Sequence, residues 1–260
     1  LGLTCWIILS PLDPPPPSSS NMLRIGGVFN KEIGLNQFNI VDSDNILPLQ
    51  FIYSGLVKFN SSNDSVLPDL AKKWIVSDDF QSIQFILRDK IYFQDGKPIT
   101  GEDVKYTYQK HMNPSHFKGI SYYSFIKSID VIDRNTIVFN FNKTFPSPEY
   151  YFSLWIIPSY LKDTELQSHP LGSGPYVFLH MKEAGSVLLR KNKIYYAEKG
   201  NPEYLFFRSY PNKKALWSGF LKREVDFYMK LDYEQLSMVE KTDWCNIVEI
   251  QELTCFILIW

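Results

Sequence analysis

The sequence predicts a mixed α/β fold, and two patterns carry this prediction. In the second half of the chain, short strand patterns alternate with helical patterns, which is the order that builds an α/β layer. In the first half, strand patterns follow one another with turn residues between them, which favours a mainly antiparallel sheet. The chain has 260 residues, of which 45% are hydrophobic and 16% aromatic, so it can bury a substantial core. We therefore expect two subdomains.

The first 22 residues form an apolar run followed by a tract rich in Pro and Ser. The run, residues 1–9, is too short to span a bilayer. We interpret residues 1–22 as the remnant of a signal peptide and a linker, which places the protein outside the cytoplasm. Cys5 suggests a lipid anchor, but a lipoprotein site has a small residue directly before its cysteine, and Thr4 fits that pattern poorly.

Strand and helix patterns then follow in order through the first half. A short strand is expected at residues 22–29. A helix that stops at Gly55 is predicted by apolar residues at helical spacing, namely Ile46, Leu49, Ile52, Tyr53 and Leu56. Alternation with a period of two predicts strands at residues 82–88 and 135–142. Their apolar faces would be formed by Ile83, Phe85 and Leu87, and by Ile137, Phe139 and Phe141.

The second half begins with a predicted hairpin and continues with alternating elements. The hairpin covers residues 174–192 and turns near Glu183, Ala184 and Gly185. Later strands are expected at residues 203–210, 225–229, 245–250 and 253–259, and helices at residues 212–224 and 232–241.

The stretch FQDGKPITGEDVKY, residues 93–106, has the form of a turn that leads into a helix. Asp95-Gly96 is a tight-turn dipeptide, because glycine accepts positive φ without steric cost. Thr100 precedes Asp103 by three residues, the spacing of a capping box, in which the hydroxyl accepts from a free backbone amide. A hydrolase that uses Asp95, Glu102 or Asp103 is the rival interpretation, and we prefer the scaffold because capping accounts for each polar residue.

Composition and spacing argue against several other classes of site. A net charge of −1 does not provide the cationic surface that nucleic acid requires. The three cysteines form no CxxC pair, and the four histidines lack the spacing of a zinc hydrolase, so we expect neither a metal site nor a cofactor. Ser173 lies between two glycines, but a proline and a strand follow it, which differs from a nucleophile elbow. We expect no catalytic residue.

Several stretches in this order resemble the extracytoplasmic solute-binding proteins of ABC transporters, family 5, which take up oligopeptides, dipeptides or nickel. They are IYSGLVKFN, the run from LPDLAKKW to GEDVKYTYQ, SIDVIDRNTIVFNFNKTFPS, PLGSGPYVF, LLRKNKIYY and SGFLKREVDFYM. Residues 93–104 are similar to the family signature F-x-D-G-x-P-[IVL]-[ST]-x-x-D-V. The sequence departs at Gly101, where Ala or Ser is usual, and this weakens the helix start slightly. It also departs in length, because the family has a second lobe.

The resemblance implies the first lobe of a type II periplasmic-binding-protein-like fold, with an inserted β-rich subdomain and the second lobe missing. The first lobe would consist of residues 23–43 and 164–260, and the inserted subdomain of residues 44–163. Aligned to the family pattern, the ligand-facing positions would be Asp42, Ser43, Tyr122, Tyr123, Ser173, Cys255 and Phe256.

The function that the resemblance implies is capture of a short peptide in a cleft between two lobes and delivery to membrane permease subunits. The protein would be a monomer in the periplasm or another extracytoplasmic space, with membrane anchoring left open. The alternatives are a nickel, haem or oligosaccharide binder of the same family, and a signalling or adhesion module without transport. As a fragment, the chain would bind ligand weakly, and the apolar CFILIW segment would favour aggregation.

Overall fold

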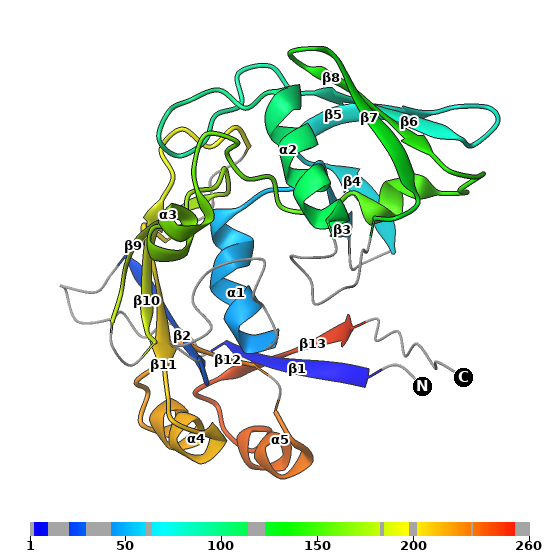
Figure 1. Ribbon diagram of the computed structural model, residues 1–260. Helices are drawn as coiled ribbons and strands as arrows, with labels where there is room; N and C mark the ends of the chain where they lie inside the picture. Colours follow the sequence, from blue (N-terminus) through cyan, green and yellow to red (C-terminus); the bar gives the residue numbers. More distant parts are fainter. Residues whose placement is uncertain are drawn as a thin grey trace. The chain divides into compact units, whose positions relative to one another are not determined.

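The computed structural model describes residues 3–9, 21–29, 43–60, 64–113, 123–182, 185–197, 202–229 and 231–252. The chain forms two compact units (Figure 1). The first contains Leu1–Glu32, Leu179–Arg190 and Asn201–Trp260, and the second contains Ile33–Phe178 and Lys191–Gly200. Strands and helices are mixed in both, so the predicted α/β class is confirmed. The predicted boundaries of a lobe and an inserted subdomain stay a prediction.

A seven-stranded mixed sheet runs in the order β13-β1-β12-β2-β11-β10-β9. β2 pairs in parallel with β11 and β12, whereas β1 is antiparallel to both β12 and β13. The strands are β1 Leu3–Leu9, β2 Met22–Gly27, β9 Tyr176–Met181, β10 Val187–Lys191, β11 Tyr204–Ser209, β12 Phe227–Met229 and β13 Asn246–Glu252. The predicted hairpin is confirmed, because β9 and β10 are neighbours and Lys182 N–H donates to Ser186 O at 2.8 Å.

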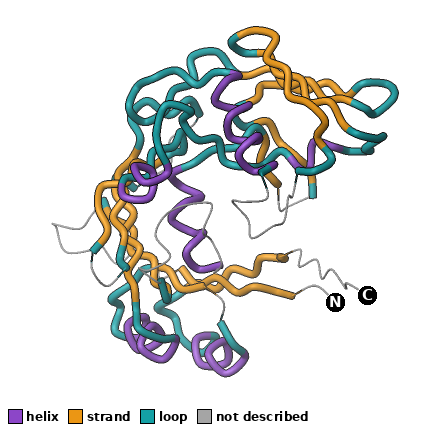
Figure 2. Tube along the Cα trace, viewed as in Figure 1, coloured by secondary structure: helices purple, strands orange, loops and turns teal. Residues whose placement is uncertain are grey.

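Two helices of the first unit, α4 Lys213–Leu221 and α5 Tyr233–Val239, share one apolar cluster centred on Phe220 and Tyr228. Each helix starts at a capping side chain, as Asn212 Oδ1 accepts from Ala215 N–H and Asp232 Oδ1 accepts from Gln235 N–H, both at 2.9 Å. Both helices were predicted from their apolar spacing. Both helices are drawn in purple at the bottom of Figure 2.

The second unit is built on a four-stranded antiparallel sheet in the order β5-β6-β8-β7. Its strands are β5 Ala71–Val76, β6 Ser82–Leu87, β7 Ile126–Asp133 and β8 Thr136–Phe141. The alternation predicted for β6 and β8 is confirmed, since every second residue of each strand is buried. A hairpin of β3 Val57–Asn60 and β4 Ser65–Pro68 belongs to the same unit, with α1 Ser43–Ile52, α2 Gly101–Met112, α3 Asp163–Ser168 and the short 3-10 helix η3 Pro148–Tyr151.

The helix α1 ends earlier than predicted. The sequence placed its end at Gly55, but the last helical residue is Ile52. Gly55 instead forms a bridge with Trp155, and a Cβ atom at Gly55 would lie only 2.7 Å from Ser153 O. The glycine is therefore needed for a close backbone approach, which apolar periodicity alone does not reveal.

The start of α2 is held by Asp103, as the capping pattern predicted. Asp103 Oδ2 accepts from Thr100 N–H at 3.0 Å, and its Oδ1 accepts from Ser159 N–H at 3.0 Å and Ser159 Oγ at 2.8 Å. The predicted capping box between Thr100 and Asp103 is present, and the Thr100 hydroxyl also donates to Asp103 Oδ2 at 2.9 Å. The carboxylate is thus the centre of the cap, and it also ties α2 to the segment around residue 159.

Gly101 is where packing outweighs helix propensity. A Cβ atom there would lie 2.9 Å from Val131 Cγ1 and 3.0 Å from Ile137 Cγ1. The sequence suggested that this glycine merely weakens the helix start. The structure indicates that it lets α2 approach β7 and β8 closely.

Candidate functional site

The candidate site of the second unit lies where the end of α1 contacts the turn at residues 171–175. We call this contact the junction. Gly174 N–H donates to Ile52 O at 2.8 Å. A Cβ atom at Gly172 would lie 2.2 Å from Ile52 O, and one at Gly174 would lie 2.6 Å from Phe51 O. Both glycines are therefore required, because the two backbones are in direct contact.

The side chain of Gln94 holds this junction together. Its Nε2 donates to Ile52 O at 2.9 Å and to Tyr176 O at 2.7 Å, while its Oε1 accepts from Gly172 N–H at 3.3 Å. Its backbone N–H also donates to Gly172 O at 2.9 Å. One amide side chain thus ties the 93–106 stretch, the end of α1 and the glycine turn to one another.

Asn192 supports the same turn from a further segment. Its Nδ2 donates to Gly174 O and its backbone N–H donates to Pro175 O, at 2.9 Å and 2.8 Å. The side chain is buried, so these bonds form away from water. The turn is consequently fixed by hydrogen bonds from three separate parts of the second unit.

A cavity of about 570 Å³ lies beside this junction, within the second unit. Its walls carry five aromatic side chains, and Tyr53 and Trp155 among them stack with centroids 5.9 Å apart and planes 14° apart. Asp69, Ser54 and Lys58 supply polar groups to the lining. An apolar hollow with a few polar groups is the usual form of a small-molecule site.

Asp69 is the buried acid of this cavity. Its Oδ2 accepts from Gly55 N–H at 3.2 Å and its Oδ1 accepts from the hydroxyl of Tyr196. Burial raises the pKa of Asp69 above its ordinary value, and the hydrogen bond from Tyr196 and the positive charges of Lys58 and Arg88 oppose this rise. Arg88 also donates from Nε to Asp69 O at 2.6 Å, which fixes the backbone beneath the carboxylate.

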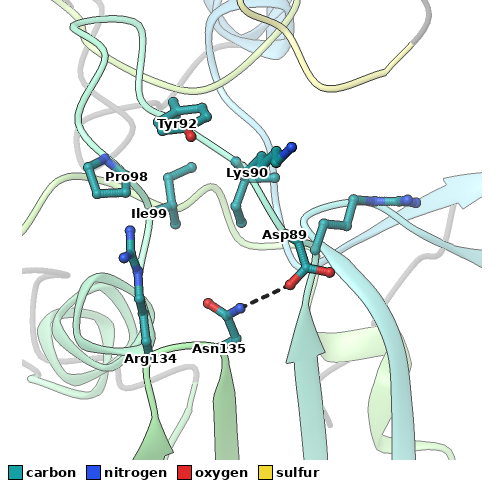
Figure 3. Close-up of a pocket in the computed structure, with 9 residues that line it drawn as sticks. Asp89, Lys90, Tyr92, Pro98, Ile99, Arg134 and Asn135 are labelled. Carbon is teal, nitrogen blue, oxygen red and sulfur yellow. Dashed lines mark hydrogen bonds between the residues drawn. The ribbon is translucent and has the colours of Figure 1, made fainter.

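A smaller hollow of about 220 Å³ is lined by residues 88–92, 98–99 and 134–135 (Figure 3). Charged residues line it, but they do not converge on one point. Asn135 Nδ2 donates to Asp89 Oδ1 at 3.3 Å on one side, and Figure 3 shows Arg134 extending beside Pro98 and Ile99 on the other. This arrangement is less suited to a ligand than the aromatic cavity is.

The predicted ligand-facing residues are only partly within the described ranges. Ser173 is buried in the glycine turn, and its Oγ has no hydrogen-bond partner among the described residues. Tyr123 is half-buried against Tyr108 and Phe125, and burial raises the pKa of its hydroxyl to about 12. Ser43 begins α1, while Asp42, Tyr122, Cys255 and Phe256 lie outside the described residues. The ligand-facing role of all seven stays a prediction.

Two of the three acids named by the rival hydrolase hypothesis, Asp95 and Asp103, form hydrogen bonds that stabilise the fold. Asp95 Oδ2 accepts from the Tyr160 hydroxyl at 2.8 Å, and its Oδ1 accepts from Lys97 N–H at 3.1 Å. Asp103 is used by the α2 cap, and Glu102 is exposed beside it. These contacts account for Asp95 and Asp103 without a substrate.

Gln94, Asp69 and Tyr195 carry no local sequence pattern that indicates a functional role. Gln94 lay inside a motif interpreted through its neighbours, and Asp69 lay in an unremarkable turn, LPDLA. Tyr195 lay in the stretch LLRKNKIYY, which contributed only to the family resemblance. Within the described ranges, no three His, Cys, Asp or Glu side chains gather closely enough to hold a metal ion. No described helix combines the length and apolar composition that crossing a bilayer requires.

The fold is similar to that of solved periplasmic binding proteins. A binding protein DppA from Helicobacter pylori in complex with the peptide STSA superposes with a TM-score of 0.74 and 22% identity, covering 85% of this chain and 49% of that chain. NikZ from Campylobacter jejuni in complex with Ni(L-His) gives a TM-score of 0.71 and 22% identity, covering 86% of this chain and 46% of that one.

The sequence carries the assignment to a family. The profile of bacterial extracellular solute-binding proteins, family 5 Middle, matches residues 65–258, and the chain belongs to this family. Di/tripeptide-binding protein 4 of Pseudomonas aeruginosa is 27% identical over 188 residues, which is 60% of this chain and 35% of that protein. Heme-binding protein A of Haemophilus influenzae is 29% identical over 162 residues, which is 51% of this chain and 30% of that protein.

Two consequences follow from these comparisons. The family is one of solute-binding proteins and not of enzymes, in agreement with the expectation from the sequence. The chain also spans less than half the length of the curated relatives named above.

Proposed function

We propose that this chain is part of the substrate-binding component of an ABC-type importer that captures short peptides between two lobes. The full-length protein would close over the ligand by hinge motion and deliver it to permease subunits in the membrane. It would work in the periplasm or an equivalent extracytoplasmic space. The family match over residues 65–258 carries this proposal.

Peptides are the favoured ligand class because relatives with that name recur. Di/tripeptide-binding proteins 4 and 1 of Pseudomonas aeruginosa and the dipeptide-binding protein of Escherichia coli all match this chain. The seven positions Asp42, Ser43, Tyr122, Tyr123, Ser173, Cys255 and Phe256 would face the ligand. Backbone hydrogen bonds and water-filled side-chain pockets would hold a peptide with little dependence on its sequence.

Haem is the second candidate, because the relative named heme-binding protein A shares 29% identity with this chain. Nickel is a weaker one. It rests on a structural neighbour whose 22% identity supports the fold alone.

The test is a binding comparison on a chain extended to the length of its relatives. Isothermal titration with mixed di- to pentapeptides should show saturable binding, while haem followed by absorbance and nickel followed by titration should show none. Absence of heat with every peptide pool would refute the peptide hypothesis, and tight haem binding alone would replace it with the second candidate.

Ser173 provides a variant that separates a ligand role from a fold role. Its hydroxyl is buried and lacks a partner among the described residues, so Ser173→Ala should leave stability unchanged or raise it by up to about 1 kcal/mol. If the hydroxyl faces the ligand, the same variant should weaken peptide binding. Unchanged affinity would remove Ser173 from the proposed site.

A further inference from the structure

We propose that the aromatic cavity of the second unit is a binding site in its own right for a small organic ammonium ion with an apolar body. This site lies wholly within the second unit and is independent of the proposed peptide capture between lobes. Its volume of about 570 Å³ falls inside the range of small-molecule sites, roughly 300–1,000 Å³.

The walls favour a cation with apolar substituents. The five aromatic side chains that line the cavity are Phe51, Tyr53, Phe59, Trp155 and Tyr195. The faces of such rings carry negative partial charge and attract ammonium groups, Trp most strongly. Their apolar surface also binds the hydrocarbon part of the ligand, so a cage of this kind selects for both features at once.

One acid provides the opposite charge. Asp69 is only 7% exposed and lines the cavity, and its two oxygens already accept from Gly55 N–H and Tyr196. A carboxylate has about four acceptor positions, so these two bonds orient it and leave capacity for a ligand N–H donor. Because the carboxylate is largely removed from water, a cation beside it gains more than it would at the surface.

The positive charge of Lys58 repels a bound cation, but this repulsion is weaker than the attraction by Asp69. Lys58 lines the cavity and is exposed on β3, so water and salt screen its charge. Arg88, the second cation near Asp69, donates to its backbone carbonyl and lies outside the cavity lining. Removing the Lys58 charge should strengthen cation binding, which gives the proposal a variant whose expected effect has the opposite sign.

The experiment measures binding of 2-phenylethylamine to the 260-residue chain by isothermal titration, with 2-phenylethanol as the neutral analogue of the same shape. We expect the amine to bind and the alcohol to bind roughly tenfold more weakly or worse. Asp69→Asn should reduce the difference between amine and alcohol to less than about threefold, and Lys58→Gln should tighten amine binding a few-fold. Asp89→Asn, at an acid outside the cavity lining, is the matched control and should change nothing.

A phenylalanine-containing dipeptide and its N-acetylated form distinguish a free amine from a peptide amino terminus as the source of the ammonium group. Discrimination between those two peptides, lost in Asp69→Asn, would assign the site to peptide amino termini.

Each variant is first checked by thermal unfolding. Wild-type chain that binds amine and alcohol equally, or binds neither at millimolar concentration, overturns the proposal, as does folded Asp69→Asn that keeps full selectivity. Peptide capture by an extended chain is measured separately, so either proposal can fail alone.

Discussion

At Gly172 two stretches of backbone meet with no room for a side chain. A Cβ atom would lie 2.2 Å from Ile52 O, and carbonyl oxygens of a helix end cannot move as the tip of a flexible side chain can. We expect Gly172→Ala to lower the free energy of unfolding by about 2–4 kcal/mol, because the turn must separate from α1 and strain the Gln94 bonds. Urea unfolding followed by circular dichroism measures this loss.

Gly96 is the matched control for that prediction. It has φ of +86°, and a Cβ atom there would meet nothing within 4 Å. Gly96→Ala should therefore cost only the backbone strain of a positive φ, about 1 kcal/mol. Equal losses for the two variants would show that close approach to α1 does not explain Gly172.

Asp69 gives a pH-dependent prediction at the same scale. Burial raises its pKa in the folded state above the ordinary value of 3.8, so the folded protein binds more protons than the unfolded chain between those two values. The stabilising contribution of the protonated acid is fully present below pH 3.8 and is lost as the pH rises through the folded-state pKa. Relative to Asp69→Asn, the wild type should therefore gain stability as the pH is lowered from 7 towards 4.

A series of urea unfolding curves across that pH range, with Asp89→Asn as a surface control, measures the difference. The groups that face Asp69 and oppose the rise in its pKa are Tyr196, Lys58, the Gly55 amide and Arg88. If the wild type instead loses stability relative to Asp69→Asn on acidification, these groups outweigh burial and the predicted direction is wrong.

The roles of single residues were predictable only where the reason is local. Asp95-Gly96 and Thr100 with Asp103 could be interpreted because turns and caps involve residues close in sequence. Gln94 and Asp69 could not, because their partners Tyr176 and Tyr196 are separated from them by 82 and 127 positions. A single sequence does not record which distant carbonyl an amide side chain reaches.

At the scale of elements, α2 shows how one side chain can control a helix start. Asp103 is 3% exposed and accepts from Thr100 N–H and from Ser159 N–H. Asp103→Ala leaves both amides without this acceptor, so we expect a loss of about 2–4 kcal/mol in the free energy of unfolding. Glu102→Ala, one residue earlier and exposed, should cost less than about 0.5 kcal/mol.

Thermal and urea unfolding of the two variants test this difference. The hydrolase hypothesis makes a different claim, namely that Asp103→Asn keeps stability and abolishes a turnover. An Asp103→Asn chain that is as stable as the wild type would contradict the capping explanation. This outcome does not depend on any assay of activity.

Elements with clear periodicity were predicted well, because a buried face imposes its period on the sequence. β6 and β8 alternate as expected, and β9 and β10 are neighbouring strands, as the predicted hairpin over residues 174–192 requires. The end of α1 was misplaced because Ile52, Tyr53 and Leu56 are all buried, although only the first is helical. Apolar spacing in a sequence does not distinguish a residue buried on the inner face of a helix from one buried just after the helix ends.

At the scale of the whole molecule, the sequence and the structure give different interpretations of residues 3–9. The sequence favours a signal remnant, whereas the structure pairs β1 with β13 along all seven residues and with β12 at three. Ile7 pairs with Met229 on one side and with Val248 on the other, so it occupies an interior position of the seven-stranded sheet. Proline there would remove a donor from the ladder and is not tolerated in an interior strand.

We therefore expect Ile7→Pro to lower the free energy of unfolding by roughly 2–4 kcal/mol, and deletion of residues 1–10 to lower it at least as much. Ile7→Val keeps the backbone donor and the β-branched side chain, so it serves as the matched control and should change stability by less than about 1 kcal/mol. A leader segment would make all three changes neutral, because it contributes nothing to the folded state. Denaturant unfolding of the three chains thus decides whether residues 3–9 belong to the sheet or precede the folded protein.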